Sequence, residues 1–316
     1  RTRRNAARGD GRYLGIGFSG FCERGGYGTP AFAARAMDIT PGFETVEISM
    51  DPSGFVEARI GASPHGQGLQ TSLAQIIADE LGMAPEHIRI IHGDTDRTPY
   101  GWGTFASRSM VISGGASKLA AQKLKARLTA AAAQHLQAES AEITIEDGRA
   151  AVRGGGAGIS LSALARAAYH QSHQFADLDE PALTARATYD PPGTFSNACH
   201  AAIVEVDRET GQVAIERYVV VEDAGRLINP LIVDGQIMGG VAQGIANALY
   251  EEIVYDEDGN LLTTLLMDYL VPTAAELPDI EIHHLETISD ASITKAKGVG
   301  EGGTIGAPAA VLGAVS

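Results

Sequence analysis

The sequence predicts an α+β fold, with mixed β-sheets and hairpins packed against helices. Paired segments that alternate apolar and polar residues are joined by turn sequences at 45–60 and 142–152, which is typical of β-hairpins. Apolar residues at helical spacing indicate separate helices, as at 69–81. The glycine-rich segment near the end of the chain lacks a surrounding βαβ unit, which disfavours a dinucleotide-binding fold.

Composition narrows the functional classes. The 316 residues are enough for one large or two medium domains, and a net charge of −15 disfavours nucleic acid and anionic membranes as partners. No apolar run is long enough for a membrane span, and no secretory signal is visible. Two cysteines, Cys22 and Cys199, do not suggest a disulfide scaffold and suit a reducing compartment, so a cytoplasmic protein is expected.

The organisation of the chain suggests two subdomains. The chain begins at Arg1 without a methionine and ends in an apolar run, so we expect a piece or a processed subunit of a longer protein. An acidic, loop-like stretch at 177–181 predicts a boundary that separates subdomain 1–180 from subdomain 181–316.

The first half is predicted to begin with strands and continue into a helix. Residues 13–20 read as a strand with close backbone packing, and 45–60 as a hairpin. The following helix, 69–81, is expected to end at Gly82. Gln67 therefore lies at a strand-to-helix turn, where free backbone N–H groups point outward.

A long polar, glycine-rich loop at 93–109 leads into a helix expected over 109–137. Loops of this length inside a compact fold are usually functional. Ser107, Arg108 and Ser109 at the helix N-terminus suit phosphate oxygens. The alternative is that Ser107 is an ordinary N-cap.

The second half is predicted to contain strands at 183–189, 199–206, 212–221 and 280–284. Asn229 as N-cap and Pro230 at the first position start a helix. Glycines inside a helix are unfavourable, so a neighbouring backbone or a cofactor must approach this one closely. Its glycines are Gly235, Gly239, Gly240 and Gly244.

The segment from Thr294 to Pro308 carries the main functional signal. Five glycines fall between Gly298 and Gly306, with one carboxylate, Glu301, among them. Glycines allow a bulky ligand to approach the backbone, and a helix is expected to start near Pro308. A buried lone carboxylate is costly unless it is paired or used, so Glu301 indicates function. The alternative is a structural glycine turn.

Four ordered segments resemble the molybdenum hydroxylases, the superfamily of xanthine oxidase, aldehyde oxidase and carbon monoxide dehydrogenase. The resemblance covers nearly the whole chain, and it is specific for the superfamily but not for the substrate. It implies the C-terminal molybdopterin-binding half of such an enzyme, with a two-subdomain architecture. The segments are Pro64-His-Gly-Gln67-Gly, Gly93 to Ser109, Asp223-Ala-Gly to Gln236, and Lys297 to Pro308.

The resemblance implies roles for individual residues. Glu301 matches the general base that takes a proton from the oxygen attacking the substrate, and Gln67 the glutamine near the metal's apical oxygen. Alternatively, Gln67 only caps its turn. Phe18 and Ser19 match residues of the substrate pocket, although Phe18 could instead belong to the core. The cofactor-contacting positions are Gly66, Gln67, Gly68, Thr104, Ala106, Ser107, Arg108, Ser109, Gln236, Lys297, Gly298, Val299, Gly300 and Glu301, and no side chain is expected to ligate the metal.

The implied cofactor is molybdenum on a pyranopterin (molybdopterin), as the cytosine dinucleotide. The implied reaction hydroxylates an electron-poor carbon of an N-heterocycle or aldehyde with oxygen from water. Electrons would pass to a 2Fe-2S subunit and an FAD subunit, because this chain lacks a cysteine set for clusters, and an N-terminal molybdopterin-binding half would complete the site. Alternatives are oxidation of carbon monoxide, a non-catalytic subunit for cofactor sheltering or assembly, and a nucleotide-binding dehydrogenase.

Overall fold

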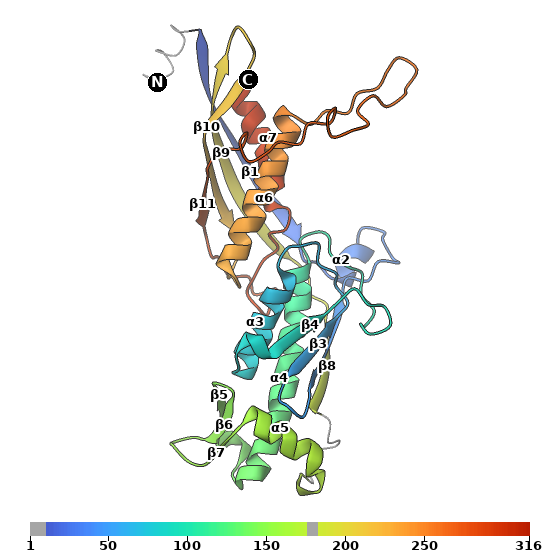
Figure 1. The fold of residues 1–316 in the computed structure, drawn as a ribbon, viewed down its shortest axis with the longest axis vertical. Coiled ribbons are helices and arrows are strands. Elements are labelled where there is room, and N and C mark those ends of the chain that lie inside the picture. The colour runs from blue at the N-terminus through green and yellow to red at the C-terminus, as the bar shows by residue number, and fades with distance from the viewer. Residues whose placement is uncertain (1–10, 176–182) are drawn as a thin grey trace. The chain divides into compact units, whose positions relative to one another are not determined.

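The structure is a computed structural model and describes residues 11–175 and 183–316 (Figure 1). Within these residues the strands form sheets of four, four and three strands, and helices pack against them, so the expected α+β class is confirmed. The chain divides into two compact units. Unit 1 consists of residues 1–25, 195–289 and 297–316, and unit 2 of residues 26–194 and 290–296.

The expected boundary between residues 180 and 181 lies outside the described residues. The observed units are built from interleaved segments rather than from two consecutive halves. This interleaving arises because the first strand of the chain pairs with a strand that begins at Thr194.

Unit 1 contains a sheet in the order β1-β9-β10-β11, which confirms the strands expected in these regions. Strands β9 and β10 are antiparallel and joined by a tight turn, in which the Asp207 carboxylate accepts hydrogen bonds from the backbone N–H groups of Glu209 and Thr210. Strand β11 runs parallel to β10. The bounds are β1 Arg12–Gly25, β9 Thr194–Asp207, β10 Val213–Asp223 and β11 Ile280–His284.

Two helices of unit 1, α6 (Pro230–Leu249) and α7 (Gly302–Val315), share a buried core with this sheet. As expected, α6 begins after Asn229, whose side chain accepts a hydrogen bond from Ile232 N at 3.1 Å. A Cβ added at Gly240 would lie 2.8 Å from the Cα of Gly303. Glycine at position 240 therefore lets the two helices approach at backbone distance. A neighbouring backbone thus explains this one of the four glycines in α6.

The start of α7 differs from the sequence prediction. The helix begins at Gly302, and Pro308 lies inside it rather than near its first turn. A Cβ at Gly17 of β1 would lie 2.0 Å from the carbonyl oxygen of Ala310, so β1 also lies against α7 at backbone distance. Packing against β1 and α6 thus overrides the weak local helix propensity of glycine and proline.

Unit 2 contains the sheet β4-β3-β2-β8, with α3 and α4 packed on each other and on the sheet. The predicted hairpin is confirmed as the antiparallel pair β2–β3, and Gly82 ends α3 in the left-handed conformation at φ 64°. The bounds are β2 Glu44–Met50, β3 Val56–Ile60, α3 Leu69–Leu81, β4 Ile88–Ile91, α4 Ser109–Leu136 and β8 Leu183–Tyr189.

A small three-stranded sheet, β5-β6-β7, forms the rest of unit 2 together with α5. Its predicted hairpin turn is confirmed, with Asp147 and Gly148 at φ 49° and 68°. The bounds are β5 Ile143–Glu146, β6 Arg149–Val152, β7 Gly158–Ser160 and α5 Leu161–His170. Short helical elements are α2 Thr29–Ala33, η1 Pro85–His87, η2 Ser140–Glu142 and η3 Ser172–Gln174.

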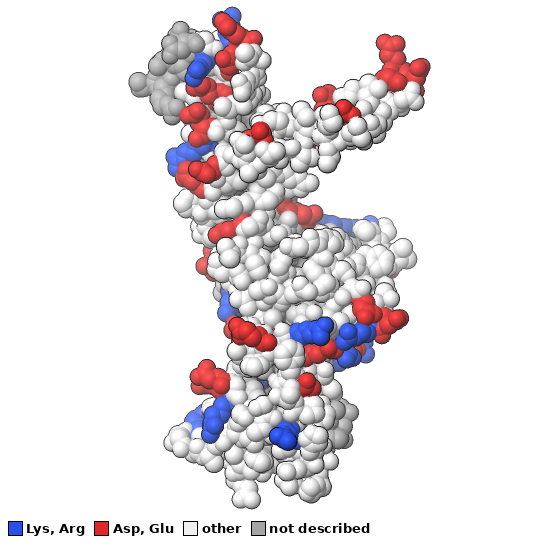
Figure 2. Space-filling view, in the orientation of Figure 1, with Lys and Arg blue, Asp and Glu red and all other residues white. Residues whose placement is uncertain are grey.

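Residues 251–279 of unit 1 form an arm with little regular structure, drawn in orange to red in Figure 1. Figure 2 shows acidic side chains near its tip and few charges along its length. Several of its apolar side chains are exposed, including Leu266 at 79% and Met267 at 85%. Among the described residues, no helix combines the length and the apolar character that crossing a bilayer requires.

Candidate functional site

The Gln67 segment of unit 2 leaves its backbone open. Gly66 and Gly68 flank Gln67 with φ of 99° and 69°, and α3 starts directly afterwards. A Cβ at Gly66 would meet no atom within 4 Å, so a flat group has room to approach there. The Gln67 Oε1 accepts a hydrogen bond from the backbone N–H of His65. Among the described residues, its NH2 group then has no acceptor and remains a free donor.

The loop before α4 holds an unusual backbone conformation. Ala106 and Ser107 have φ of 50° and 48°, in the left-handed region that residues other than glycine rarely occupy. Helix α4 begins two residues later, at Ser109, with Arg108 as its N-cap and no side-chain capping bond. The alternative of Ser107 as an ordinary N-cap is therefore not observed. The hydroxyls of Thr104 and Ser109 lie 2.7 Å apart and close this turn.

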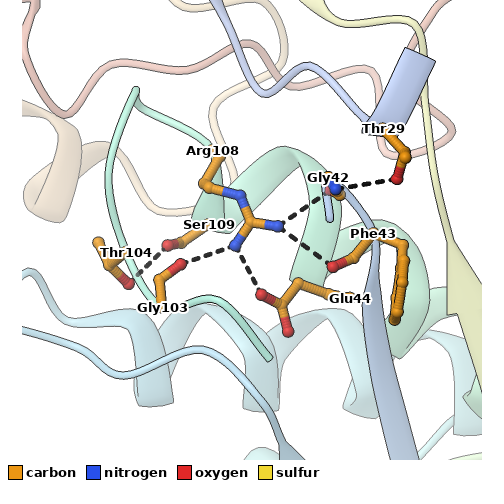
Figure 3. A network of polar contacts seen from close by, with 8 residues as sticks. All are labelled: Thr29, Gly42, Phe43, Glu44, Gly103, Thr104, Arg108 and Ser109. Atoms are coloured by element: carbon orange, nitrogen blue, oxygen red, sulfur yellow. Dashed lines mark hydrogen bonds and ion pairs between the residues drawn. The ribbon is translucent and has the colours of Figure 1, made fainter. Parts of the chain in front are cut away.

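Arg108 occupies a different environment from the one expected. Its side chain is fully buried, and it forms an ion pair of 2.6 Å with Glu44, which is 1% exposed (Figure 3). The guanidinium also donates to the carbonyl oxygens of Gly103, Gly42 and Phe43. It is thus occupied by protein groups rather than open to a phosphate, and it ties the loop to the start of β2.

Burial raises the pKa of the Glu44 carboxyl. The hydrogen bond and the positive charge of Arg108 lower this pKa, but their effect is smaller than that of burial. A Cβ at Gly61 would lie 2.7 Å both from the Glu44 carboxylate and from the Cα of Gly101. The chain that leads to Gln67 and the loop that leads to Ser109 therefore meet at backbone distance. In unit 2 the residue that directly follows β3, before the Gln67 segment, thus lies against the loop 93–109.

In unit 1, Lys297 and the Asp223 segment are joined. The Lys297 ammonium lies 3.0 Å from Asp223 Oδ2, with both side chains buried, and Lys297 N donates to the carbonyl of Ala224 at 2.8 Å. Asp223 also accepts from the backbone N–H groups of Gly225 and Thr287. Burial opposes its ionisation, yet these donors hold the pKa of Asp223 below its usual range. Lys297 thus fixes the loop that carries Gly298, Val299 and Gly300.

Glu301 is the N-cap residue of α7, and its carbonyl oxygen accepts the N–H groups of Thr304 and Ile305. The expected burial of this carboxylate is not observed, because Glu301 is exposed on unit 1. Gly302 and Gly303, which follow it, are buried. At the start of α7, Glu301 is therefore exposed to solvent, whereas Gly302 and Gly303 lie in the interior of unit 1.

The glycines of α6 serve two purposes. Gly240 and Gly244 contact α7, whereas a Cβ at Gly235 or Gly239 would meet no atom within 4 Å. These two open positions flank Gln236, so a flat group can lie against the helix there. Each unit therefore has open backbone beside its own predicted glutamine, Gln67 in unit 2 and Gln236 in unit 1.

Phe18 and Ser19, consecutive on β1, point to opposite faces of their strand. Phe18 is 70% exposed and is not part of the core. Their assignment to a substrate pocket stays a prediction. Among the described residues, no group of three or more His, Cys, Asp or Glu side chains is placed to hold a metal ion.

Sequence reasoning missed two buried carboxylates that support these segments. Glu44 lies 64 positions before its partner Arg108, and no local pattern links the two. Glu222 is the last of the residues of β10 whose side chains point into the core, and its carboxyl lies against Gly302. An acidic residue at the end of an apolar strand is the one signal that could have revealed Glu222.

Comparison with known proteins shows what the chain is similar to. The molybdopterin cofactor-binding domain family matches residues 1–278. The chain is 43% identical over 317 residues to the nicotine 6-hydroxylase large subunit of Paenarthrobacter nicotinovorans, covering 99% of this chain and 39% of the relative. It is 40% identical over 295 residues to the carbon monoxide dehydrogenase large chain of Hydrogenophaga pseudoflava, covering 93% and 36%.

Solved structures agree with this likeness. Quinoline 2-oxidoreductase from Pseudomonas putida 86 superposes with a TM-score of 0.92 at 42% identity, covering 99% of this chain and 40% of that one. Carbon monoxide dehydrogenase from Oligotropha carboxidovorans gives 0.89 at 36% identity, with 99% and 39% covered. The chain thus spans well under half the length of these relatives. It belongs to the molybdopterin cofactor-binding domain family, within the molybdenum hydroxylases.

Proposed function

We propose that the chain is the cofactor-binding part of the large subunit of a molybdenum hydroxylase that acts on an electron-poor carbon of an N-heterocycle. The observation that carries this proposal is the exposed Glu301 carboxylate at the N-cap of α7, directly after the glycine-rich segment. Relatives named for nicotine and quinoline, at 43% and 42% identity, support an N-heterocycle as the substrate.

We propose that this chain binds the cofactor through backbone groups and uncharged hydrogen-bond donors. In unit 2, the open backbone at Gly66 and the NH2 group of Gln67 suit a flat pterin with oxygen ligands. In unit 1, taken by itself, the open backbone at Gly235 and Gly239 likewise suits a flat group. The backbone from Gly298 to Gly300 and the segment from Thr104 to Ser109 would hold its remaining parts. When bound, the molybdenum cofactor supplies the two-electron oxidation that inserts an oxygen from water at carbon.

Glu301 would act as the general base. Its carboxylate takes the proton from the water-derived oxygen as that oxygen bonds to the substrate carbon. The carbon loses its hydrogen, so each turnover releases two electrons and two protons. Gln67 would position the oxygen through its NH2 group, and Phe18 and Ser19 would contribute to the substrate pocket.

The electrons require partners that this chain does not supply. We propose a 2Fe-2S subunit and an FAD subunit, an N-terminal molybdopterin-binding half, the cytosine dinucleotide form of the cofactor, and a cytoplasmic location. The exposed apolar side chains of the arm, such as Leu266 and Met267, would pack against the N-terminal half.

The test uses the full-length large subunit with its partner subunits. Glu301→Gln is expected to reduce turnover about 10²–10⁴-fold at unchanged molybdenum content. Glu257→Gln, which alters an exposed carboxylate of the arm, serves as the matched control and should retain turnover. Turnover by Glu301→Gln at the wild-type rate, with normal molybdenum content, would show that Glu301 is not the base.

Dye reduction with quinoline, nicotine, benzaldehyde and carbon monoxide identifies the substrate class. The 40% identity to a carbon monoxide dehydrogenase large chain favours carbon monoxide oxidation as the second candidate. Reduction with carbon monoxide alone would replace the N-heterocycle proposal. A molybdenum-loaded protein that reduces dye with none of the four would instead indicate a subunit that shelters or assembles the cofactor.

A further inference from the structure

A row of buried polar side chains lies beneath α7 in unit 1. Ser196 and His200 of β9 and Tyr218 and Glu222 of β10 are all fully buried. The Tyr218 hydroxyl and His200 Nδ1 lie 2.9 Å apart. Among the described residues, Ser196 Oγ, His200 Nε2 and both carboxyl oxygens of Glu222 have no hydrogen-bond partner. Such groups are rare in native proteins and call for an explanation.

The strand register places Glu222 at the centre of this row. Glu222 pairs with Ala198 on β9, so Ser196 and His200 are its two diagonal neighbours on the same face of the sheet. The tight backbone of α7 covers this face. A Cβ at Gly306 would lie 2.5 Å from His200 Cδ2, and a Cβ at Gly302 would lie 2.5 Å from a Glu222 carboxyl oxygen.

The first turn of α7 therefore rests directly on the Glu222 carboxyl. Gly302 immediately follows Glu301, which is the N-cap of the same helix. Any change in the size or charge of the Glu222 carboxyl acts on the backbone of this turn. No flexible side chain lies between them, because position 302 is glycine.

The carboxylates of Glu23 and Asp223 disfavour an ionised Glu222. Glu23 of β1 and Asp223 of β10 are close enough to oppose its ionisation, and Glu301 is at the adjacent helix end. The nearby cation, Lys297, is bound to Asp223. His200 adds no charge, because burial lowers its pKa to about 4. Burial first, and then Glu23 and Asp223, raise the pKa of Glu222 to about 8.

A helix N-terminus favours a nearby anion, which would act in the opposite direction. The Glu222 carboxyl, however, lies against the Cα of Gly302 and accepts no hydrogen bond from the N–H groups of the first turn. An ionised Glu222 would thus be a buried charge without a partner, which proteins relieve by neutralising the group or by opening the structure around it.

We propose that Glu222 is a positioning residue whose uncharged carboxyl group supports the first turn of α7 and thereby sets the position of Glu301. The inference rests on the proposed role of Glu301 as the base. Ionisation of Glu222 loosens the turn from Gly302 to Gly306 and displaces Glu301, so activity falls at alkaline pH.

The test compares Glu222→Gln with wild type in the full-length protein and its partner subunits. Glutamine keeps the shape but cannot ionise. Glu216→Gln is the matched control, because it alters an exposed glutamate on the same strand. In infrared titration, wild type and control should lose a protonated-carboxyl band with a midpoint near pH 8, and Glu222→Gln should lack this band. An unchanged band in Glu222→Gln would overturn the proposal.

Two further readouts separate positioning from a merely structural role. Protection of the amides of residues 300–306 against hydrogen exchange should drop above pH 8 in wild type and not in Glu222→Gln. With quinoline or nicotine as substrate, kcat should fall about tenfold per pH unit above this midpoint in wild type, and Glu222→Gln should lose the fall at unchanged KM.

The two hypotheses fail in different ways. If Glu301→Gln retains turnover, the assignment of the base is wrong, while the infrared and exchange results still report on Glu222. If Glu301→Gln is inactive but Glu222→Gln keeps the alkaline fall in kcat, the positioning role of Glu222 is wrong and the base stands.

Discussion

The guanidinium of Arg108 and the carboxylate of Glu44 form a buried ion pair of 2.6 Å that connects the N-cap of α4 to the first residue of β2. Removing one partner of such a pair leaves a charge in a site without water, and this costs more than the pair itself contributes. The pair therefore fixes the loop that ends at Ser109, although neither side chain is open to a ligand.

Glu44→Gln is expected to destabilise the protein by about 3–5 kcal/mol, because the Arg108 charge stays buried without its counter-charge. Denaturant unfolding of the full-length protein measures this change. The matched control is Glu47→Gln on the same strand, whose 3.5 Å pair with Arg186 has side chains 38% and 67% exposed. That exposed pair should contribute at most about 1 kcal/mol. Equal losses in both variants would contradict a special role for the buried pair.

Glu222 should make unfolding depend on pH. Its pKa is raised from an ordinary 4.5 to about 8, so the folded protein holds this proton more tightly than the unfolded chain. The stabilisation is complete below about pH 4.5 and is lost as pH rises through about 8. The full shift corresponds to roughly 4–5 kcal/mol.

Glu222→Gln should remove this part of the pH dependence, so the variant gains stability relative to wild type as pH rises from 5 to 9. Denaturant midpoints across that range provide the measurement. A constant difference between the two proteins would mean that Glu222 does not change its protonation on unfolding.

Alanine substitutions at two glycines of α6 should change the stability of the protein in opposite directions. Gly240→Ala should destabilise the protein by about 1–3 kcal/mol, because its Cβ would lie 2.8 Å from the Cα of Gly303. Gly239→Ala, at an open position of the same helix, should stabilise it by up to about 1 kcal/mol. If the pterin lies beside Gln236, Gly239→Ala should nevertheless lower the molybdenum content. Normal molybdenum content in Gly239→Ala would place the cofactor elsewhere.

Gln67→Leu tests the free amide donor of unit 2. Loss of one preorganised donor to a reacting oxygen typically lowers kcat about 10²–10³-fold. We expect a loss of that order with molybdenum content retained, measured by dye reduction and elemental analysis. Gln70→Leu, one turn along and exposed, is the control. Similar losses in both variants would indicate a general effect on α3 instead.

Local sequence patterns predicted the elements that local chemistry determines. Asp147-Gly148 adopts the left-handed conformations that its hairpin turn requires, and the Asn229 side chain caps the helix that begins at Pro230. The start of α7 was misplaced because its small residues become helical only against β1 and α6, whose sequences lie far away.

The sequence predicts which segments form the candidate site, but it does not predict the burial or the interaction partners of the side chains in them. The motif identified Glu301, yet its exposure depends on which face of α7 packs on the sheet. The sequence equally gave no sign that Arg108 is bound by Glu44, because long-range pairing between charged residues leaves no local periodicity. The expected burial of Glu301 and the expected phosphate contact of Arg108 differ from the structure for these reasons.

The backbone contact between Gly17 and Ala310 has a consequence for biosynthesis. At ~5–20 residues per second, a ribosome needs roughly 15–60 s to make the chain between these two positions. Throughout that interval β1 has no α7 to cover it, and its other neighbour, β9, also emerges late. Nascent β1 therefore lacks both of these packing partners until β9 and then α7 have been synthesised, and its contact with Ala310 can form only after that.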